Sequence, residues 1–184
     1  KYPVTSINTD NFSRTDLDKY NVLIMPSGNY NKMLNDTNMK KLKDWVRSGG
    51  KVIAIERALN AFVDKEGFSL SYKTVDKDKD TKEVTNLLSY AEREREASND
   101  MLESAIFKST VDNTHPIAFG YNNYYFTYKT KPTAYKLLNT GYNIAYLSDA
   151  KVYSGFVGQR ALNNSIIPLS SVKNQQEVVV ISIL

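Results

Sequence analysis

The sequence contains no cysteine, so thiolate nucleophiles, disulfide bonds and thiolate metal sites are all excluded from this chain. Histidine is nearly absent too: His115 stands alone, whereas a zinc site built on imidazole needs two or three. No serine lies in a G-x-S-x-G context, which a serine nucleophile paired with His115 would need. The sequence therefore excludes a zinc catalytic domain and the usual cysteine and serine hydrolases. His115 precedes Pro116, and we expect it to tie down a loop through a ring nitrogen.

Long apolar runs are also missing, since no window approaches the roughly 18 apolar residues of a membrane-spanning helix. The chain opens with KYPVTSI rather than with Met and a basic, then apolar, segment, so we expect no signal peptide in these residues. Because it begins without Met and ends inside the apolar run EVVVISIL, we expect that both ends were cut from a longer protein.

What is present is typical of a globular protein. The 184 residues suit one domain, 1–184, and 41% of them are apolar while 24% are charged. The formal charge is +4, but the longest charged stretch, residues 73–96, mixes both signs. Such a stretch is a solvated face rather than a nucleic-acid groove, so we expect no nucleic-acid partner.

The first third of the chain has the pattern of a strand, a helix and a second strand. After a β-branched strand at 2–7, residues 20–25 end in a continuous apolar run, and residues 51–55 form another. Between them, residues 36–50 have helical periodicity, with Asp36 or Thr37 as cap, an inward face and Gly49-Gly50 as the stop. The inward face is Met39, Leu42, Trp45 and Val46. This order predicts two parallel strands, covered on both faces, in an α/β fold.

The rest of the chain reads as a polar excursion, a helix and a series of short strands. The helix is expected near Thr81–Ser98, with Val84, Leu87, Leu88 and Ala91 inward. The strands are expected in AIFKS, YYFTYK, NIAYLS, KVYSGFVG, SIIPLSS and EVVVISIL, which could pair as hairpins or extend the sheet.

A possible reactive corner lies where the strand 51–55 ends. A nucleophile elbow needs small residues two positions before and after the nucleophile, and around Glu56 these are Ala54 and Ala58. Glu56 could act as a base or nucleophile only with a partner acid or cation, and Arg57 can simply neutralise it. The alternative is an ordinary strand end followed by a charged helix start.

Residues 26–30, PSGNY, follow the preceding strand at its carboxyl end, where parallel α/β sheets place their ligand loops. Gly28 allows a backbone amide to point outward as an oxyanion-hole donor would. The alternative is that Pro-Ser-Gly forms an ordinary turn. The candidate cleft comprises Gly28, Asn29, Tyr30, Glu56, Arg57 and His115.

The run YNNYYFTYK places Tyr124, Phe126 and Tyr128 on one strand face and Tyr125 on the other. Exposed, such a stripe could stack on sugars or on a partner protein; buried, it is core. Since apolar strand faces are usually packed, we expect core together with an interface.

Five segments together resemble the C-terminal region of secreted zinc carboxypeptidases of Bacteroidetes-type bacteria: LDKYNVLIMPSGNY, LKDWVRSGGKVIAIERA, YAERERE, FKSTVDNTHPIAFGY and VYSGFVG. In that family a class I glutamine amidotransferase-like domain follows the peptidase domain. The resemblance implies a three-layer, flavodoxin-like sandwich with a mostly parallel sheet. It places Glu56 where active amidotransferases hold the catalytic Cys, and Gly28 in the loop that gives an oxyanion-hole amide.

The resemblance further implies a secreted or periplasmic parent that hydrolyses peptide bonds with zinc. The zinc would belong to the absent peptidase domain, so we expect no cofactor and no metal here, and the peptidase domain as partner. The leading hypothesis is a non-catalytic accessory domain of that carboxypeptidase. One alternative is a glycan- or peptide-binding module using the tyrosine-rich strands and the vestigial cleft. The other is an unconventional hydrolase based on Glu56 with His115.

Overall fold

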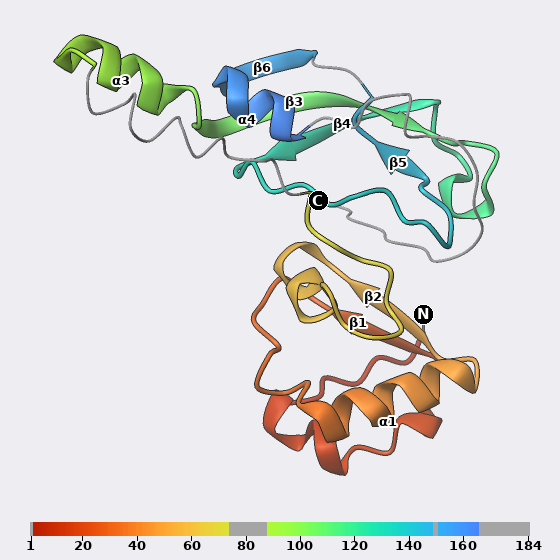
Figure 1. Cartoon of the computed structure of the whole chain (residues 1–184). Coiled ribbons are helices and arrows are strands. Elements are labelled where there is room, and N and C mark those ends of the chain that lie inside the picture. Colours follow the sequence, from red (N-terminus) through yellow and green to blue (C-terminus); the bar gives the residue numbers. More distant parts are fainter. Residues whose placement is uncertain (1, 74–87, 149–150, 166–184) are drawn as a thin grey trace. The chain divides into compact units, whose positions relative to one another are not determined.

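A computed structural model describes residues 2–73, 88–148 and 151–165. Its contacts divide the chain into two compact units, which we call the N-terminal unit, up to Phe68, and the C-terminal unit, from Ser69. Each unit is described below by itself (Figure 1). That residues 1–184 form one domain stays a prediction.

The N-terminal unit is built on two parallel strands, β1 (Val22–Met25) and β2 (Lys51–Ala54), joined through helix α1 (Asp36–Arg47). The ladder continues past β2, because the Ile55 amide donates to the Met25 carbonyl at 3.0 Å. The predicted parallel pair is thereby confirmed, and with it a mixed α/β architecture. The expected strand at 2–7 is wrong, since those residues have no regular secondary structure.

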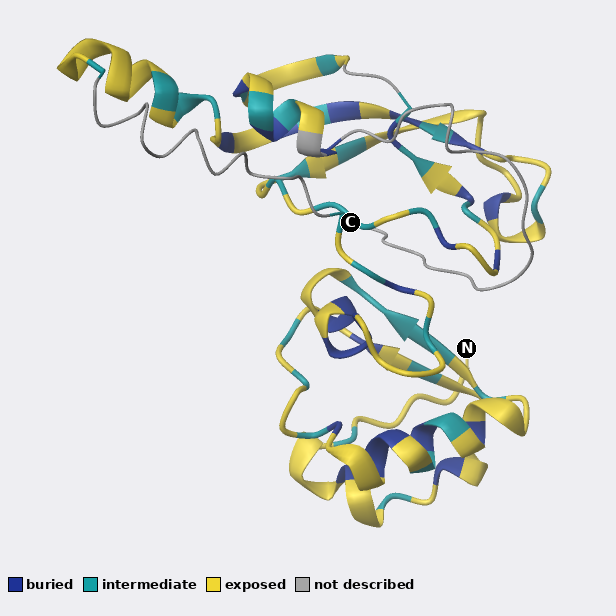
Figure 2. Cartoon of the chain, in the orientation of Figure 1, coloured by how far each residue is buried: buried dark blue, intermediate teal, exposed yellow. Residues whose placement is uncertain are grey.

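Helix α1 packs through one apolar face made of Met39, Leu42 and Trp45, all of which are buried. Val46, expected on the same face, is exposed. The cap also differs from the prediction: the Asn35 side chain, rather than Asp36 or Thr37, accepts a hydrogen bond from the Asn38 amide at 3.0 Å. Figure 2 shows this helix with buried and exposed residues alternating along it.

Two 3₁₀ helices precede β1: η1 (Thr9–Arg14) and η2 (Leu17–Lys19). Lys41 of α1 holds η1 in place, because its Nζ donates to the carbonyl of Phe12 at 3.3 Å, of Ser13 at 2.9 Å and of Thr15 at 2.5 Å. The amino group thus adds hydrogen bonds to carbonyl oxygens at the end of this short helix.

The sheet of the N-terminal unit is not covered on both faces. Val22 and Ile24 of β1 are exposed, with relative accessibilities of 43% and 58%, whereas Met25 is buried. The prediction that this strand is covered on both faces, made from its continuous apolar run, is therefore wrong for β1 in the described residues.

The C-terminal unit is an antiparallel sheet centred on β3 (Leu102–Val111). Strand β4 (Tyr124–Lys129) pairs with one edge of β3, while β5 (Ala145–Tyr146) and β6 (Val152–Val157) also pair with β3. Figure 1 shows β4 and β6 on opposite sides of β3. The larger sheet of the described residues is thus antiparallel, which differs from the mostly parallel sheet that was expected.

One face of this sheet is packed against helix α4 (Gln159–Ser165). Phe107 and Ala105 of β3 are fully buried there beside Ala161 of α4, and Leu102 and Leu147 complete the cluster. Sequence periodicity missed α4, whose seven residues hold few apolar side chains.

Helix α3 (Tyr90–Ser98) has no buried residue, as Figure 2 shows. Its start is fixed by a capping box, in which Glu92 accepts from the Ser89 amide at 2.9 Å. The expected inward face is wrong for Ala91, which is exposed, while Leu88 is half-buried. The predicted start at Thr81 and the residues Val84 and Leu87 lie outside the described residues.

Candidate functional site

The strand-to-helix corner at Glu56 has an unusual backbone. Glu56 follows β2 at the start of 3₁₀ helix η3 (Glu56–Ala61) and has φ of 52°. This left-handed region costs an L-residue about 1–2 kcal/mol, and nucleophile elbows hold their reactive residue on a similarly strained strand-to-helix turn. Ala58 is fully buried, as the close approach at an elbow requires, and Ala54 is half-buried. The corner therefore combines a left-handed backbone and a closely packed Ala58 with an exposed carboxylate.

Glycine at position 56 would relieve the left-handed strain. We expect the free energy of unfolding of Glu56→Gly to be about 1 kcal/mol higher than that of Glu56→Ala. Only the alanine variant keeps the Cβ that clashes at positive φ. Urea unfolding of the two purified variants measures the difference.

The matched control is the next residue, Arg57, which is exposed like Glu56 but does not have a positive φ. There the order should reverse, with Arg57→Gly less stable than Arg57→Ala by about 0.5–1 kcal/mol. The same order at both positions would contradict a left-handed corner.

The neighbouring loop Pro26–Tyr30 is closed by its own tyrosine. The Tyr30 hydroxyl donates to the Pro26 carbonyl at 3.0 Å, and a Cβ on Gly28 would lie 3.2 Å from the Tyr30 ring. A Cβ at position 28 would thus be in tight contact with the ring, and Gly28 does not have a positive φ. The Asn29 side chain accepts from the Asn31 amide at 3.1 Å and so stabilises the turn itself.

His115 stabilises a loop through a ring nitrogen, as the sequence predicted. Its Nδ1 accepts from the Ile117 amide at 3.2 Å and caps the 3₁₀ helix η4 (Pro116–Ala118). The imidazole also packs on Tyr142, with ring centroids 4.7 Å apart. His115 belongs to the C-terminal unit, and the five other residues of the expected cleft belong to the N-terminal unit.

The face of the antiparallel sheet opposite the α4 side carries exposed rings. We call Tyr124, Phe126, Tyr128 and Tyr153 the aromatic face; their relative accessibilities run from 38% to 63%. Three of the rings form a chain of contacts, with centroids 5.8 Å apart for Tyr124–Phe126 and 4.7 Å for Phe126–Tyr153. The prediction of core is therefore wrong for Tyr124, Phe126 and Tyr128, and the interface expected with it stays a prediction. The alternation of side chains along the strand correctly predicted which residues share a face. It does not indicate whether other residues cover that face.

A cation lies among these rings. Lys108 of β3 pairs with Phe126 across the strands, and its Nζ lies 4.3 Å from the centre of the Tyr124 ring. This cation–π contact keeps the ammonium group on the aromatic face.

The far edge of β4 has backbone groups that no described strand pairs with. The Val111 amide donates to the Asn123 carbonyl at 3.0 Å, so these two residues form a hydrogen-bonded pair in the ladder. Such pairs alternate along antiparallel strands, so Tyr125, Thr127 and Lys129 exchange hydrogen bonds with β3. The amide and carbonyl groups of the intervening Tyr124, Phe126 and Tyr128 consequently point away from β3, and no described strand pairs with them.

At the end of β4 lies a pair of lysines that the sequence did not single out. Burial, together with the nearby charge of Lys73, lowers the pKa of Lys129 to about 8. The Lys129 Nζ donates to the Thr133 carbonyl and that of Lys73 to the Asn163 carbonyl, both at 2.8 Å. Next to them, burial raises the pKa of Tyr135 to about 12, and its ring stacks on Tyr72 at 5.4 Å.

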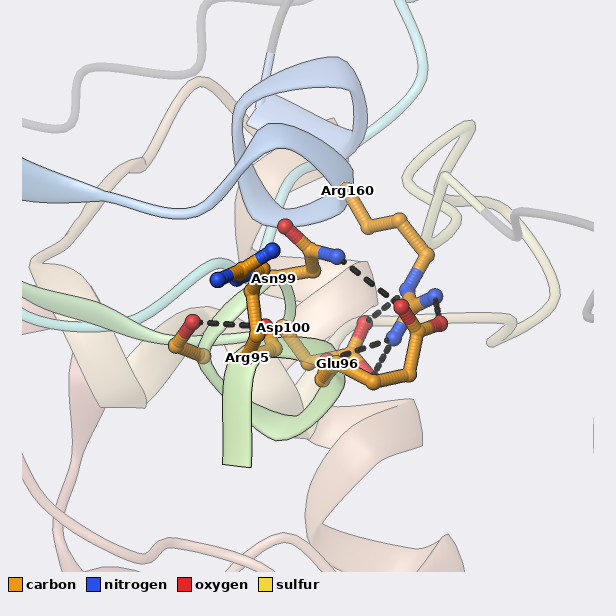
Figure 3. Close-up of polar contacts among 6 residues, drawn as sticks. Arg95, Glu96, Asn99, Asp100 and Arg160 are labelled. Atoms are coloured by element: carbon orange, nitrogen blue, oxygen red, sulfur yellow. Dashed lines mark hydrogen bonds and ion pairs between the residues drawn. The ribbon is translucent and has the colours of Figure 1, made fainter. Parts of the chain in front are cut away.

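A partly exposed ion-pair cluster connects α3 to α4 (Figure 3). Arg160 donates to both carboxylate oxygens of Asp100, at 3.0 and 3.1 Å, and also pairs with the Glu96 carboxylate. The Arg160 guanidinium lowers the pKa of Glu96, and the two carboxylates raise the pKa of Arg160. The Arg160 guanidinium and the carboxylates of Glu96 and Asp100 bond to one another. The cluster therefore links the two helices and does not form an open binding site.

The N-terminal unit has a surface hollow of about 670 Å³ between residues 14–18 and α1. It contains none of the residues expected in the cleft, and its lining mixes Arg14, Lys40 and Lys41 with Asp16, Asp18 and Asp44. Such a lining favours no ligand of one charge.

Among the described residues, no group of three or more acidic or histidine side chains is placed to hold a metal ion. Within the same part of the chain, no helix is long and apolar enough to cross a membrane. Comparison with known protein families, with curated proteins and with solved structures finds no match.

Proposed function

We propose that this chain is a non-catalytic accessory domain of an exported, secreted or periplasmic zinc carboxypeptidase, with an amidotransferase-like, flavodoxin-like fold. The observation that carries the proposal is the corner at Glu56. It combines a φ of 52°, a fully buried Ala58 and a chain without cysteine. An inherited elbow that has lost its nucleophile accounts for all three.

The chemistry of the corner agrees with this reading. A carboxylate attacks an amide poorly, and a general base needs a substrate position beside a partner acid. In the described part of the N-terminal unit, the Glu56 carboxylate is exposed and no hydrogen bond or ion pair orients it. The domain would therefore act by binding. The zinc-dependent reaction of the parent protein would be carried out by the peptidase domain.

Amide hydrolysis tests the loss of catalysis. We expect the purified chain to release no ammonia from glutamine and no amino acid from short peptides above the buffer rate. Glu56→Gln should behave in the same way. Turnover by the wild type that disappears in Glu56→Gln would overturn the proposal.

The reading frame that encodes these residues tests the assignment to a carboxypeptidase. We expect an upstream H-x-x-E zinc motif and a secretory signal peptide. A complete reading frame with neither would contradict the parent enzyme that we propose.

A second candidate is a glycan- or peptide-binding module. The aromatic face favours it, because its four rings are exposed and three of them, Tyr124, Phe126 and Tyr153, form a chain of ring contacts. Contiguous exposed aromatic surface is typical of binding sites for proteins and for other ligands.

A further inference from the structure

We propose that β4 binds an extended acidic peptide, which adds a strand to the free edge of the antiparallel sheet. This inference rests on the proposed binding role and names the kind of partner. Strand addition obtains affinity from main-chain hydrogen bonds and specificity from alternate side chains. Both kinds of contact are available along β4.

The backbone supplies the first argument. The amide and carbonyl groups of Tyr124, Phe126 and Tyr128 point away from β3, and no described strand pairs with them. Natural sheets protect such edges with short strands, charged side chains, proline or bulges. Strand β4 has six residues, contains no proline and pairs with β3 without a register shift. Its one charged residue, Lys129, lies at its last position and donates to the Thr133 carbonyl. An edge of this length with so little protection is suited to receiving another strand.

The side chains and their charge supply the second argument. Residues of an added strand would alternate between the aromatic face and the opposite face, where Lys129 lies. From residue 113 to residue 136 the chain contains Lys129, Lys131 and Lys136 but no acidic residue, and Lys108 lies on the aromatic face. A peptide that alternates apolar and acidic residues matches this pattern. A second copy of β4 would bring only like charge, which disfavours pairing between copies.

A matched pair of peptides tests the charge and the binding mode. The probes are N-acetylated peptide amides of six residues, as long as β4, alternating valine with glutamate or valine with lysine. Isothermal titration with the full chain should give at least about tenfold tighter binding of the glutamate peptide, and a difference that shrinks in high salt. Equal affinities would overturn the inference.

N-methylation of the glutamate peptide tests strand pairing without changing the protein. A methyl group on amides of one alternate set removes donors that face β4, and we expect about tenfold weaker binding. Methylation of the other set leaves those donors in place and should weaken binding much less. If both sets have the same effect, the peptide does not bind as a strand.

Two substitutions locate the edge on the protein. Phe126→Pro removes an amide that points away from β3, so the ladder with β3 is kept. It should weaken peptide binding at least about tenfold, whereas Phe126→Val keeps the amide and should lose less. Hydrogen exchange of β3 amides checks that both variants keep the sheet.

The remaining outcomes are decisive as well. Binding of a glucan hexasaccharide but of neither peptide, or dimers that Phe126→Pro disrupts, would overturn the inference. Neither result would touch the proposed loss of catalysis, which the hydrolysis assay and the reading frame test separately.

Discussion

Phe107→Ala is expected to lower the free energy of unfolding of the C-terminal unit by about 3–5 kcal/mol. Phe107 lies at the middle of β3, is fully buried and packs in the cluster formed with Leu102, Ala105, Leu147 and Ala161. Truncation removes most of an aromatic side chain from a site enclosed by β3 and α4, so the loss combines transfer to water with a residual cavity.

Hydrogen exchange of the β3 amides measures this effect within the unit itself. Protection of the slowest amides should fall by about two to four orders of magnitude, following the loss of stability. Phe156→Ala is the matched control, because Phe156 has a relative accessibility of 52% and should change protection little. Similar losses at both positions would contradict the position of the core.

The sequence predicted the N-terminal unit better than the C-terminal one, for a physical reason. Residues 22–25 and 51–54 are short apolar runs on either side of a helix with a clear apolar face, and this order admits few arrangements. The C-terminal strands could pair in many orders. Which strand lies beside β3 depends on long-range contacts that periodicity does not encode.

Two features of the candidate site had no local signal. A left-handed backbone is expected at Gly or Asn, so Glu56 gave no sign of it beyond the flanking alanines. Alternation in β4 identified the side chains that share a face, but exposure depends on what covers that face. The cap of α1 was missed because Asn35, Asp36 and Thr37 are all good caps, and only the geometry distinguishes them.

We expect the buried Lys129 at the end of β4 to make the stability of the protein depend on pH in the alkaline range. The pKa of Lys129 is about 8 in the folded chain, below its ordinary value of 10.5. Between these two values the unfolded chain binds the proton and the folded chain does not, so the free energy of unfolding rises with pH. Below pH 8 the folded chain must keep a buried ammonium ion, at a cost of about 3 kcal/mol that disappears as the pH approaches 10.5.

Lys129→Met should remove this dependence. At pH 7 we expect the variant to be about 1–2 kcal/mol more stable than the wild type, because relief of the buried charge exceeds loss of the hydrogen bond to Thr133. Between pH 8 and 10.5 this advantage should decline and then reverse. Urea unfolding at several pH values measures it, and Lys131→Met, which removes an exposed lysine, is the control. An advantage that stays constant with pH would contradict the shifted pKa.

Tyr135 sets the upper limit of the same profile. Its pKa is about 12 in the folded chain against an ordinary 10.0, so between these values the folded chain binds the proton more strongly and stability falls as pH rises. The opposite shifts of Lys129 and Tyr135 have the same cause, since burial disfavours the ammonium ion and the phenolate alike. The stability contributed by the two groups should therefore be greatest near pH 10, and Tyr135→Phe should remove the fall above it while leaving the rise below it.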